Sequence, residues 1–339
     1  MHGQMDIAGV WYWILGLLLW LYVLTDGFDL GVGVLCLFTG DEAKRGAMIE
    51  TIEGVWHANQ TWLVMLGGVL FGAFPVVYGT ILVPLYLPAG LLLFAFMARG
   101  IGLECRAEAT HKRFWSLLFG WGSLAVILAH GFLIGAVLQG MPFSGGTYLG
   151  GPFDWFSPFT LLVCLTFICL YVTLATGWLV LRTGGTLEAS ARRAGVGWGL
   201  ATLVSLVVTL LYIVFSGHIG YLVGRPGGGG VSPRFVAWIA AAVVAAVLFF
   251  RALITGGQGR PFYWCAVMLA CVFLGFGTSL YPLILPPDLT AAQAASPPAM
   301  LRIMLAVVGS LLPVLLIYNI YQYRVFRGKV TADGASDPS

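Results

Sequence analysis

Two acidic residues stand inside an apolar run near the N-terminus. The run over residues 7–37 carries Asp26 and Asp29 in its second half. A charge at membrane depth costs roughly 2.5–3.5 kcal/mol on insertion scales, so such residues usually face a protein interior or water. Residues with this spacing share one face of a helix. We therefore expect both carboxylates to face into a helix bundle; the alternative is a helix that emerges early and leaves them at the membrane surface.

A second polar group opens the next apolar run and includes Glu53 and His57. If the first run descends to the inner side and the second starts there, Asp26, Asp29 and His57 can meet in the inner half of the membrane. A carboxylate pair beside an imidazole suits a proton relay, because histidine titrates near neutral pH. The proton-path candidates are therefore Asp26, Asp29, His57 and Glu53. The alternative for His57 is an interfacial side chain bonded to a backbone carbonyl.

Other polar and aromatic residues of the second and third runs are candidates for structural contacts or for binding a polar ring. Trp56 and Trp62 also suit anchors at the membrane surface, and Asn59 and Gln60 suit hydrogen bonds between helices. At the inner end of the third run, three charged residues predict either an ion-pair network or a site for a headgroup or ring. They are Arg99, Glu104 and Arg106.

Nothing in the sequence supplies a complete catalytic site. His130 and His218 stand alone, so we interpret both as structural, and no C-x-x-C-H motif for covalent haem attachment is present. Nucleotide-binding and hydrolase fingerprints are missing as well. The chain is thus expected to ligate no metal or haem. A buried acid site limits it to moving protons or ions, or to supporting a partner that performs redox chemistry.

Composition identifies the surroundings of these residues as a membrane. Hydrophobic residues make up 59% of the 339 residues and charged residues only 9%, against roughly 25% charged in soluble domains. We expect an all-α protein with about nine membrane-spanning helices, arranged as two four-helix bundles plus one peripheral helix. The expected spans are 7–37, 56–78, 80–103, 114–138, 157–181, 195–216, 235–255, 261–285 and 302–325.

Basic residues gather in alternate connections between these spans. Among all 17 Lys and Arg residues, only Arg225, Arg234 and Arg302 fall near the other set of connections. Since basic loops stay in the cytoplasm, this pattern predicts an outer N-terminus and a cytoplasmic C-terminus. We expect one polytopic membrane domain over 1–330 and a polar cytoplasmic tail over 331–339. The small net charge of +3, without a basic stripe, argues against nucleic acid as a partner.

Several motifs, in order along the chain, resemble subunit II of the cytochrome bd-type ubiquinol oxidases, including the cyanide-insensitive branch. The likeness extends from about Met5 to Val330. It is carried by Thr25-Asp26-Gly27-Phe28-Asp29-Leu30-Gly31-Val32-Gly33, Trp56-x-x-Asn59-Gln60-x-Trp62-Leu63, Gly67-Gly68-x-Leu70-Phe71-x-Ala73-Phe74-Pro75-x-x-Tyr78, Arg99-Gly100 through Glu104-x-Arg106, Gly135-x-x-x-Gln139-Gly140-x-Pro142-Phe143, Tyr281-Pro282-x-x-x-Pro286, and Leu311–Lys329 with Pro313, Tyr318, Tyr321, Tyr323, Phe326, Arg327 and Gly328.

The resemblance implies a multi-pass protein of the bacterial inner membrane that pairs with a haem-bearing subunit I. In that family, subunit I carries haems b and d and the quinol oxidation site, and the complex reduces dioxygen to water. Subunit II ligates no haem, contributes to cytoplasmic proton uptake and can hold a structural ubiquinone or menaquinone. A small single-helix accessory subunit and lipid are further partners that the resemblance allows.

One position departs from the family pattern. The family usually has Trp-Asp-Gly-Asn where this chain has Trp56-His57-Ala58-Asn59, so either an imidazole replaces the family's acid or protons enter elsewhere. The rival hypothesis is an ion- or proton-coupled secondary transporter with an aspartate site. Transporters of that kind often show inverted repeats and broken helix pairs in matching halves, and neither pattern is evident here.

Overall fold

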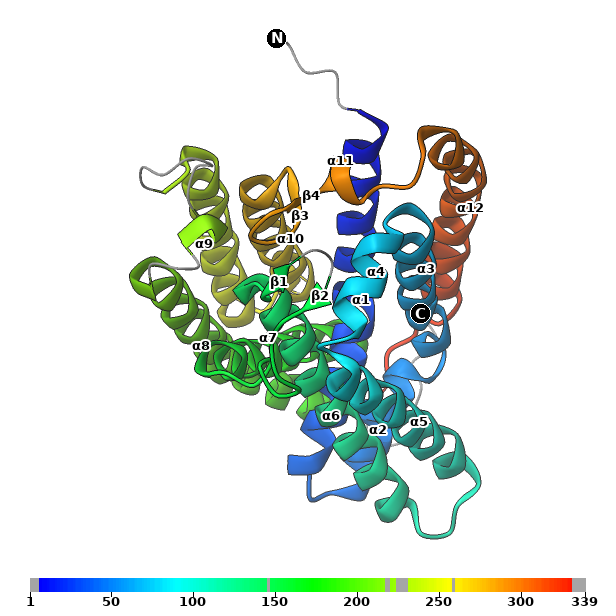
Figure 1. Cartoon of the computed structure of the whole chain (residues 1–339). Coiled ribbons are helices and arrows are strands. Elements are labelled where there is room, and N and C mark those ends of the chain that lie inside the picture. Colours follow the sequence, from blue (N-terminus) through cyan, green and yellow to red (C-terminus); the bar gives the residue numbers. More distant parts are fainter. Residues whose placement is uncertain (1–5, 145–146, 217–219, 224–230, 258–259, 331–339) are drawn as a thin grey trace.

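A computed structural model describes residues 6–144, 147–216, 220–223, 231–257 and 260–330. The predicted tail at 331–339 and His218 lie outside these residues. The chain is almost entirely helical (Figure 1). The elements are α1 (Ile7–Phe38), α2 (Glu42–Glu53), α3 (Trp56–Ala73), α4 (Pro75–Leu82), α5 (Tyr86–Glu108), α6 (Lys112–Gln139), β1 (Phe143–Ser144), β2 (Thr147–Tyr148), α7 (Pro158–Arg182), α8 (Gly185–Ser216), the 3-10 turn η1 (Gly220–Leu222), α9 (Pro233–Ile254), α10 (Arg260–Leu280), β3 (Leu283–Leu285), β4 (Leu289–Thr290), α11 (Ala291–Ala294) and α12 (Pro298–Val325).

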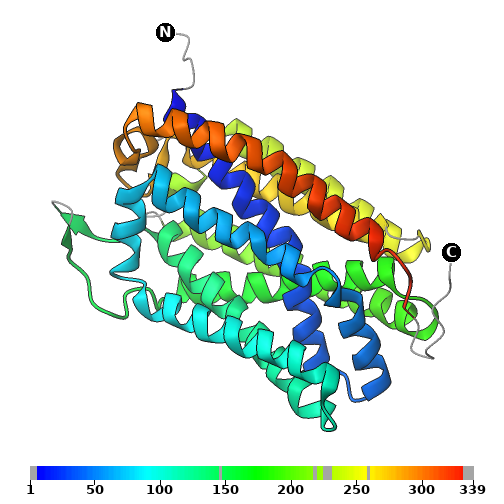
Figure 2. The ribbon, with the colours of Figure 1, turned by 90° about the vertical axis from the view of Figure 1, so that its right-hand side faces the viewer.

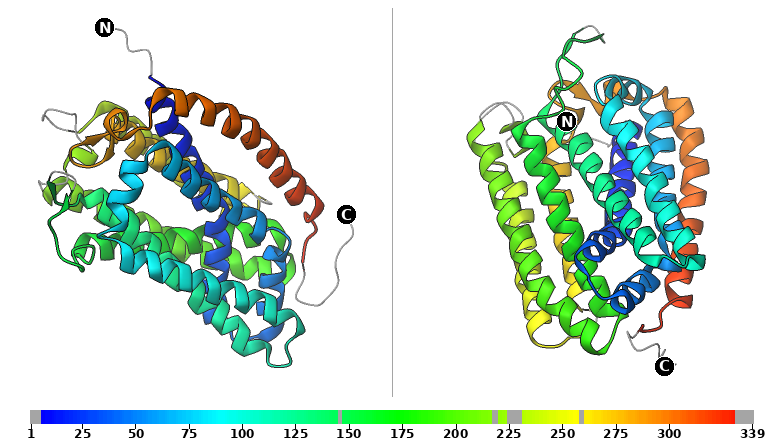
Figure 3. Two further views of the ribbon diagram at one scale, coloured as in Figure 1. Left: turned by 45° about the vertical axis from the view of Figure 1, so that its right-hand side comes forward. Right: turned by 90° about the horizontal axis from the view of Figure 1, so that it is seen from below.

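The long helices form two groups that meet at α1 and α7. On one side α1 packs against α3 and α6, and α5 packs against α6; on the other, α7 packs against α8 and α10, and α9 against α10. Viewed from below, the two groups lie on opposite sides of the molecule (Figure 3). Helix α12 runs along the outside (Figure 2), where only Leu301 and Asn319 are buried. This arrangement agrees with the predicted pair of bundles plus a peripheral helix.

The outer surface is that of a membrane protein. In the part of the chain that the structure describes, eight helices are long and apolar enough to cross a membrane, and the bent pair of α3 and α4 would be a ninth. Large apolar side chains on the outer helices are exposed, among them Phe94, Phe215 and Ile317. Such side chains are stable against lipid, because lipid tails are as apolar as they are.

The second predicted span ends earlier than expected. Helix α3 stops at Ala73 and α4 turns away from it by 110°, so the span predicted as 56–78 is broken and the next helix starts at Tyr86 rather than residue 80. Pro75 explains the break: it has no N–H to donate, and it disfavours helical geometry at the preceding Phe74, which has φ −133° and ψ 61°. Ser296 satisfies two carbonyl groups at the end of α3: its hydroxyl donates to Gly72 O at 2.7 Å, and its N–H donates to Ala73 O at 2.9 Å.

The segment 39–55, which is a polar connection in the predicted topology, contains the additional helix α2. Asp41 caps it by accepting hydrogen bonds from the N–H groups of Ala43 and Lys44. The helix buries Met48, Ile49 and Ile52 on one side, so it lies against the bundle rather than in solvent. It therefore brings its charged side chains to the neighbouring ends of α1, α5 and α6.

Candidate functional site

A buried ion pair joins the first and third predicted spans. Asp26 on α1 and Arg99 on α5 are both fully buried, and Arg99 Nη1 donates to Asp26 Oδ1 at 2.7 Å. Arg99 Nη2 also lies 3.6 Å from Asp29 Oδ2. A buried charge is tolerated where an opposite charge and hydrogen bonds compensate it. The prediction that both acids face into the bundle is therefore confirmed.

Asp29 has further partners from two other helices. Asn59 Nδ2 on α3 donates to Asp29 Oδ2 at 2.8 Å and lies 3.2 Å from the carbonyl of Thr25. The Tyr323 hydroxyl on α12 donates to Asn59 Oδ1 at 2.6 Å. Four separate helices thus contribute to this acid cluster, which we define as Asp26, Asp29, Asn59, Arg99 and Tyr323.

Glycines on α1 allow the helix that carries both acids to approach α7 closely. A Cβ atom on Gly31 would lie 2.0 Å from the backbone oxygen of Tyr171, and one on Gly27 would lie 2.9 Å from the Tyr171 ring. These contacts press the helix against α7 on one side while Asp26 and Asp29 meet α3 and α5 on another. The spacing Asp26-Gly27-Phe28-Asp29-Leu30-Gly31 therefore combines a packing face with a polar face.

The charge of the acid cluster does not balance when both carboxylates are ionised. Two carboxylates face one guanidinium, which leaves an excess of one negative charge. Among the described residues, Asp26 Oδ2 and Asp29 Oδ1 are buried and have no hydrogen-bond partner. Carboxylate oxygens in this condition can bind a proton or interact with a cation. The arrangement can therefore hold a proton inside the helix bundle.

His57 does not join the acid cluster, contrary to the prediction. Its side chain is 71% exposed, and its Nε2 lies 3.7 Å from Glu104 Oε1, which is likewise exposed. The cause is rotation about the axis of α3: Asn59 and Trp62 are buried on the inner side, so His57 points outward. The prediction that Asp26, Asp29 and His57 meet is wrong.

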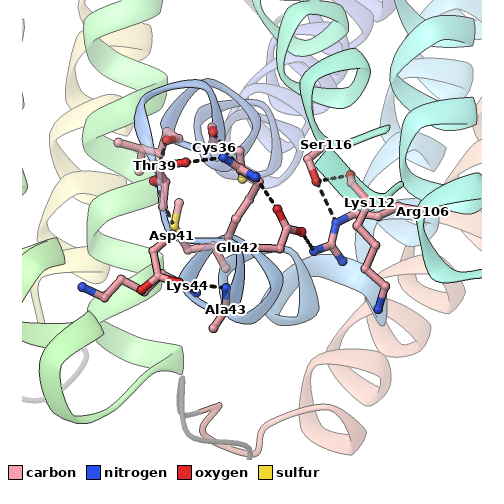
Figure 4. Close-up of polar contacts among 12 residues, drawn as sticks. Cys36, Thr39, Asp41, Glu42, Ala43, Lys44, Arg106, Lys112 and Ser116 are labelled. Carbon is pink, nitrogen blue, oxygen red and sulfur yellow. Dashed lines mark hydrogen bonds and ion pairs between the residues drawn. The ribbon is translucent and has the colours of Figure 1, made fainter. Parts of the chain in front are cut away.

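The predicted network of Arg99, Glu104 and Arg106 is also separated into different sites. Arg99 joins the acid cluster, and Glu104 pairs with His57. Arg106 donates to Ser116 at 2.8 Å and pairs with Glu42 of α2 at 2.7 Å, as Figure 4 shows. Their spacing along α5 directs the three side chains to different neighbours, so no mutual ion-pair network forms.

Glu53 lies at the rim of an acidic cleft, away from the acid cluster. The cleft has a volume of about 490 Å³ and is lined by Glu42, Ala43, Gly46, Glu50, Glu53, Arg106 and Lys112. Partial desolvation, and secondly the neighbouring Glu50 carboxylate, raise the pKa of Glu53 above its usual value. The cleft thus places several carboxylates beside the neighbouring ends of α5 and α6.

The residues predicted to hold a quinone do not converge on one pocket. Asn59 and Arg99 are engaged by the two aspartates, and Arg106 by Glu42 and Ser116. Trp56 and Trp62 are buried, Gln60 is half-buried, and Glu104 is exposed. Arg106 lines the acidic cleft, and none of these residues lines a smaller cleft between the described ends of α7, α10 and α12. Asn59, Arg99 and Arg106 thus make structural polar contacts, and a role of these residues in binding a quinone stays a prediction.

His130 has tyrosine partners at both ring nitrogens. The hydroxyl of Tyr22 lies 2.9 Å from Nε2, and that of Tyr171 lies 3.4 Å from Nδ1. Within the described residues, no group of three or more His, Cys, Asp or Glu side chains could hold a metal ion. The buried imidazole therefore acts as a hydrogen-bonded packing residue between α1, α6 and α7.

Two members of the acid cluster are not predicted from the sequence. Arg99 is predicted to join a different group, although a cation within an apolar run needs a counter-ion at similar depth, and Asp26 and Asp29 are such carboxylates. Tyr323 carries no comparable signal, because a tyrosine near the end of a span usually indicates a membrane-surface anchor. Glu42 is not predicted as a partner of Arg106 because its segment is expected to be a loop.

Comparisons with known proteins agree with this geometry and with each other. The model of the family described as cytochrome bd terminal oxidase subunit II matches residues 7–326. The chain is 29% identical to cytochrome bd-I ubiquinol oxidase subunit 2 of Escherichia coli (strain K12), over 96% of this chain and 95% of that protein. It is 28% identical to cytochrome bd ubiquinol oxidase subunit 2 of Bacillus subtilis (strain 168), over 96% of this chain and 97% of that protein.

A solved structure shows the same fold. The chain aligns with a chain in the structure of bd oxidase from Geobacillus thermodenitrificans with a TM-score of 0.77 and 19% sequence identity. The alignment covers 94% of this chain and 98% of the other. The helix order and packing described above are therefore shared along nearly the whole length of both chains.

Proposed function

Because the chain belongs to the cytochrome bd terminal oxidase subunit II family, we propose that it supports a haem-bearing subunit I in a quinol oxidase and provides an intramembrane proton-binding site. The chain is a multi-pass protein of the bacterial inner membrane. Membership of this family favours the oxidase subunit over the secondary transporter. The haems b and d and the quinol oxidation site are assigned to subunit I.

The observation that carries the proton-binding role is the charge of the acid cluster. Asp26, Asp29 and Arg99 are fully buried, and together they hold one negative charge in excess when both acids are ionised. Binding one proton makes the cluster neutral, which lowers its free energy at membrane depth. Protons consumed in oxygen reduction can thus be held here before transfer to the partner subunit.

We propose that protons reach this cluster from the inner end of α12 and not through His57. Tyr323 lines the smaller cleft and also contacts Asn59. The amide of Asn59 holds Tyr323 and Asp29 in position but does not itself carry a proton. The proposed route therefore requires a water molecule, entering from the cleft, to pass the proton to Asp29. His57 and Glu104 are assigned to the surface that subunit I covers, because both side chains are exposed on this chain.

Quinone, lipid and the accessory subunit are separate from the proton-binding role. A ubiquinone or menaquinone bound by this chain is expected from the family resemblance alone. A small single-helix accessory subunit remains a prediction from the family resemblance. None of these partners is needed for the acid cluster to bind a proton.

The test uses the intact oxidase, purified with its partner, carrying Asp29→Asn or Asp26→Asn in this chain. Haem content measures assembly, and quinol-driven oxygen uptake is expressed per assembled complex. We expect Asp29→Asn to lower oxygen uptake by roughly tenfold or more, as for loss of a proton-transfer group. Asp26→Asn should also lower assembly, since it removes the counter-ion of Arg99.

His57→Asn and Tyr323→Phe distinguish the two entry routes. His57→Asn should leave oxygen uptake per complex unchanged and act, if at all, on the amount of partner that copurifies. Tyr323→Phe should slow oxygen uptake. Unchanged assembly and unchanged oxygen uptake in both aspartate variants would overturn the proton-binding role. A loss of uptake in His57→Asn but not in Tyr323→Phe would overturn the proposed route alone.

A further inference from the structure

A smaller cleft, which shares Tyr323 with the acid cluster, opens where α7, α10 and α12 end on the same side of the molecule. Its volume is about 180 Å³, and it is lined by Trp178, Leu181, Arg182, Tyr263, Tyr323 and Arg327. Arg182 is the last residue of α7, and Tyr263 lies in the first turn of α10. Two arginines and two tyrosines thus line a small space at the level of the helix ends.

The guanidinium of Arg182 is buried without an acidic partner among the described residues. Arg182 is 7% exposed, and its Nε is buried without a hydrogen-bond partner. Its Cζ lies 5.2 Å from the centre of the Trp178 ring, which offers a cation–π contact but no negative charge. A buried cation left uncompensated is costly, so a counter-ion is expected in the cleft.

The carboxylate on the neighbouring helix α8 is already engaged elsewhere. Glu188 pairs with Arg192 at 2.8 Å, and its other oxygen lies 3.7 Å from Lys329. The backbone of Val330 pairs with that of Arg182, its N–H donating to the Arg182 carbonyl at 2.9 Å. This pairing holds the end of the described chain beside the cleft but brings no acidic side chain into it.

We propose that this cleft binds an anionic phosphate group, either the headgroup phosphate of an acidic phospholipid or free phosphate. A guanidinium presents a planar set of donors that matches phosphate oxygens. Arg182 supplies a buried cation, Arg327 an exposed one at the rim, and the Tyr263 hydroxyl a further donor. Basic pockets of this kind, at the inner ends of membrane helices, suit acidic lipid headgroups.

The test measures binding and requires no turnover, so it is independent of the proton-binding role. The delipidated oxidase complex is titrated with dioleoylphosphatidylglycerol, and bound lipid is counted by native mass spectrometry. Arg327→Gln and Arg182→Gln should each weaken one saturable binding event about tenfold, as for loss of one charge-assisted contact. Arg324→Gln is the matched control, because it removes an exposed arginine in the last turn of α12, three residues before Arg327, that does not line the cleft.

Two further arms identify the source of the phosphate group. If millimolar inorganic phosphate displaces the lipid, or binds with the same dependence on Arg327, the ligand includes free phosphate. If it does neither, the site binds a lipid headgroup. Should Arg182→Gln fail to fold, the exposed Arg327 still decides the result. Equal phosphatidylglycerol binding in all variants, without phosphate binding, would overturn the proposal. Binding that appears only after removal of residues 331–339 would also overturn it, since the tail would then be the natural occupant.

Discussion

The guanidinium of Arg99 lies between two carboxylates that come from the same turn of α1. It donates to Asp26 at 2.7 Å, while Asp29 is held mainly by Asn59 at 2.8 Å. The two acids thus have different partners, although both are fully buried. At the scale of single residues, Asp26 compensates the arginine and Asp29 is the acid more available for proton binding.

Arg99→Gln should destabilise the oxidase more than any single change on the surface of this chain. Removing one partner of a buried ion pair typically costs about 3–5 kcal/mol, because the other charge is left uncompensated. The double variant Asp26→Asn with Arg99→Gln should recover part of that loss. Thermal unfolding of the single and double variants measures the coupling. Strictly additive effects would contradict a direct interaction between the two side chains.

Glu53 should make the stability of the complex depend on pH. Desolvation raises its pKa in the folded protein above the ordinary value of 4.5, so folding favours the protonated form. The resulting stabilisation is present below pH 4.5 and is lost as pH rises through the raised pKa. The melting temperature of Glu53→Gln relative to the native complex should therefore increase with pH across this range. A difference that is constant with pH would contradict this assignment.

The close approach of α1 and α7 is the contact between elements on which the acid cluster depends. Gly31 faces the Tyr171 backbone with no room for a Cβ, whereas a Cβ added to Gly16 of the same helix would meet nothing within 4 Å. Pro75, the first residue of α4, also sets the direction of a helix, because α3 ends before it and α4 runs at 110° to α3. Small and cyclic residues thus set the positions of whole helices here.

Gly31→Ala should reduce assembly of the oxidase severely, while Gly16→Ala should be tolerated. The added methyl of Gly31→Ala would lie 2.0 Å from a backbone oxygen, so α1 and α7 would have to separate. The amount of haem-containing complex recovered from membranes measures the effect. Both variants place the same methyl group on the same helix, so equal recovery would show that the α1–α7 contact does not control assembly.

At the scale of the molecule, the two helical groups form a scaffold with an apolar outer surface and a polar interior near one end. The acid cluster, the acidic cleft and the smaller cleft around Arg182 draw on α1, α2, α3, α5, α6, α7, α10 and α12. The orientation of this scaffold in the membrane remains a prediction. It follows from the distribution of basic residues, which places these sites toward the cytoplasm.

Reporter fusions test that orientation. A fluorescent protein that folds only in the cytoplasm should be bright when fused after Ser339, and alkaline phosphatase should be active when fused after Tyr148. The reason is that basic connections stay inside while the segment 139–156 carries no Lys or Arg. The reverse pair of results would invert the predicted topology and place the acid cluster nearer the outer surface.

The sequence by itself determined the membrane location, the two buried acids and the family resemblance. These properties depend on local composition, on spacing along one helix and on short motifs, and Asp26 and Asp29 share a helix face wherever that helix is placed. The number and approximate positions of the spans follow in the same way from apolar runs. The bend at Pro75 and the helix α2 do not follow from the sequence alone, because their effects depend on packing against the bundle.

Only the tertiary structure decided which side chains meet. When a helix is apolar on most of its surface, its sequence does not show which face turns toward the bundle. The direction of the His57 side chain was therefore open, and in the structure it points outward. Arg99 meets its acids on α1, Tyr323 reaches Asn59 from α12, and Arg182 faces a cleft. These contacts join residues far apart in the chain, and the physical reason is that helix neighbours and rotations are set by packing, which no single helix encodes.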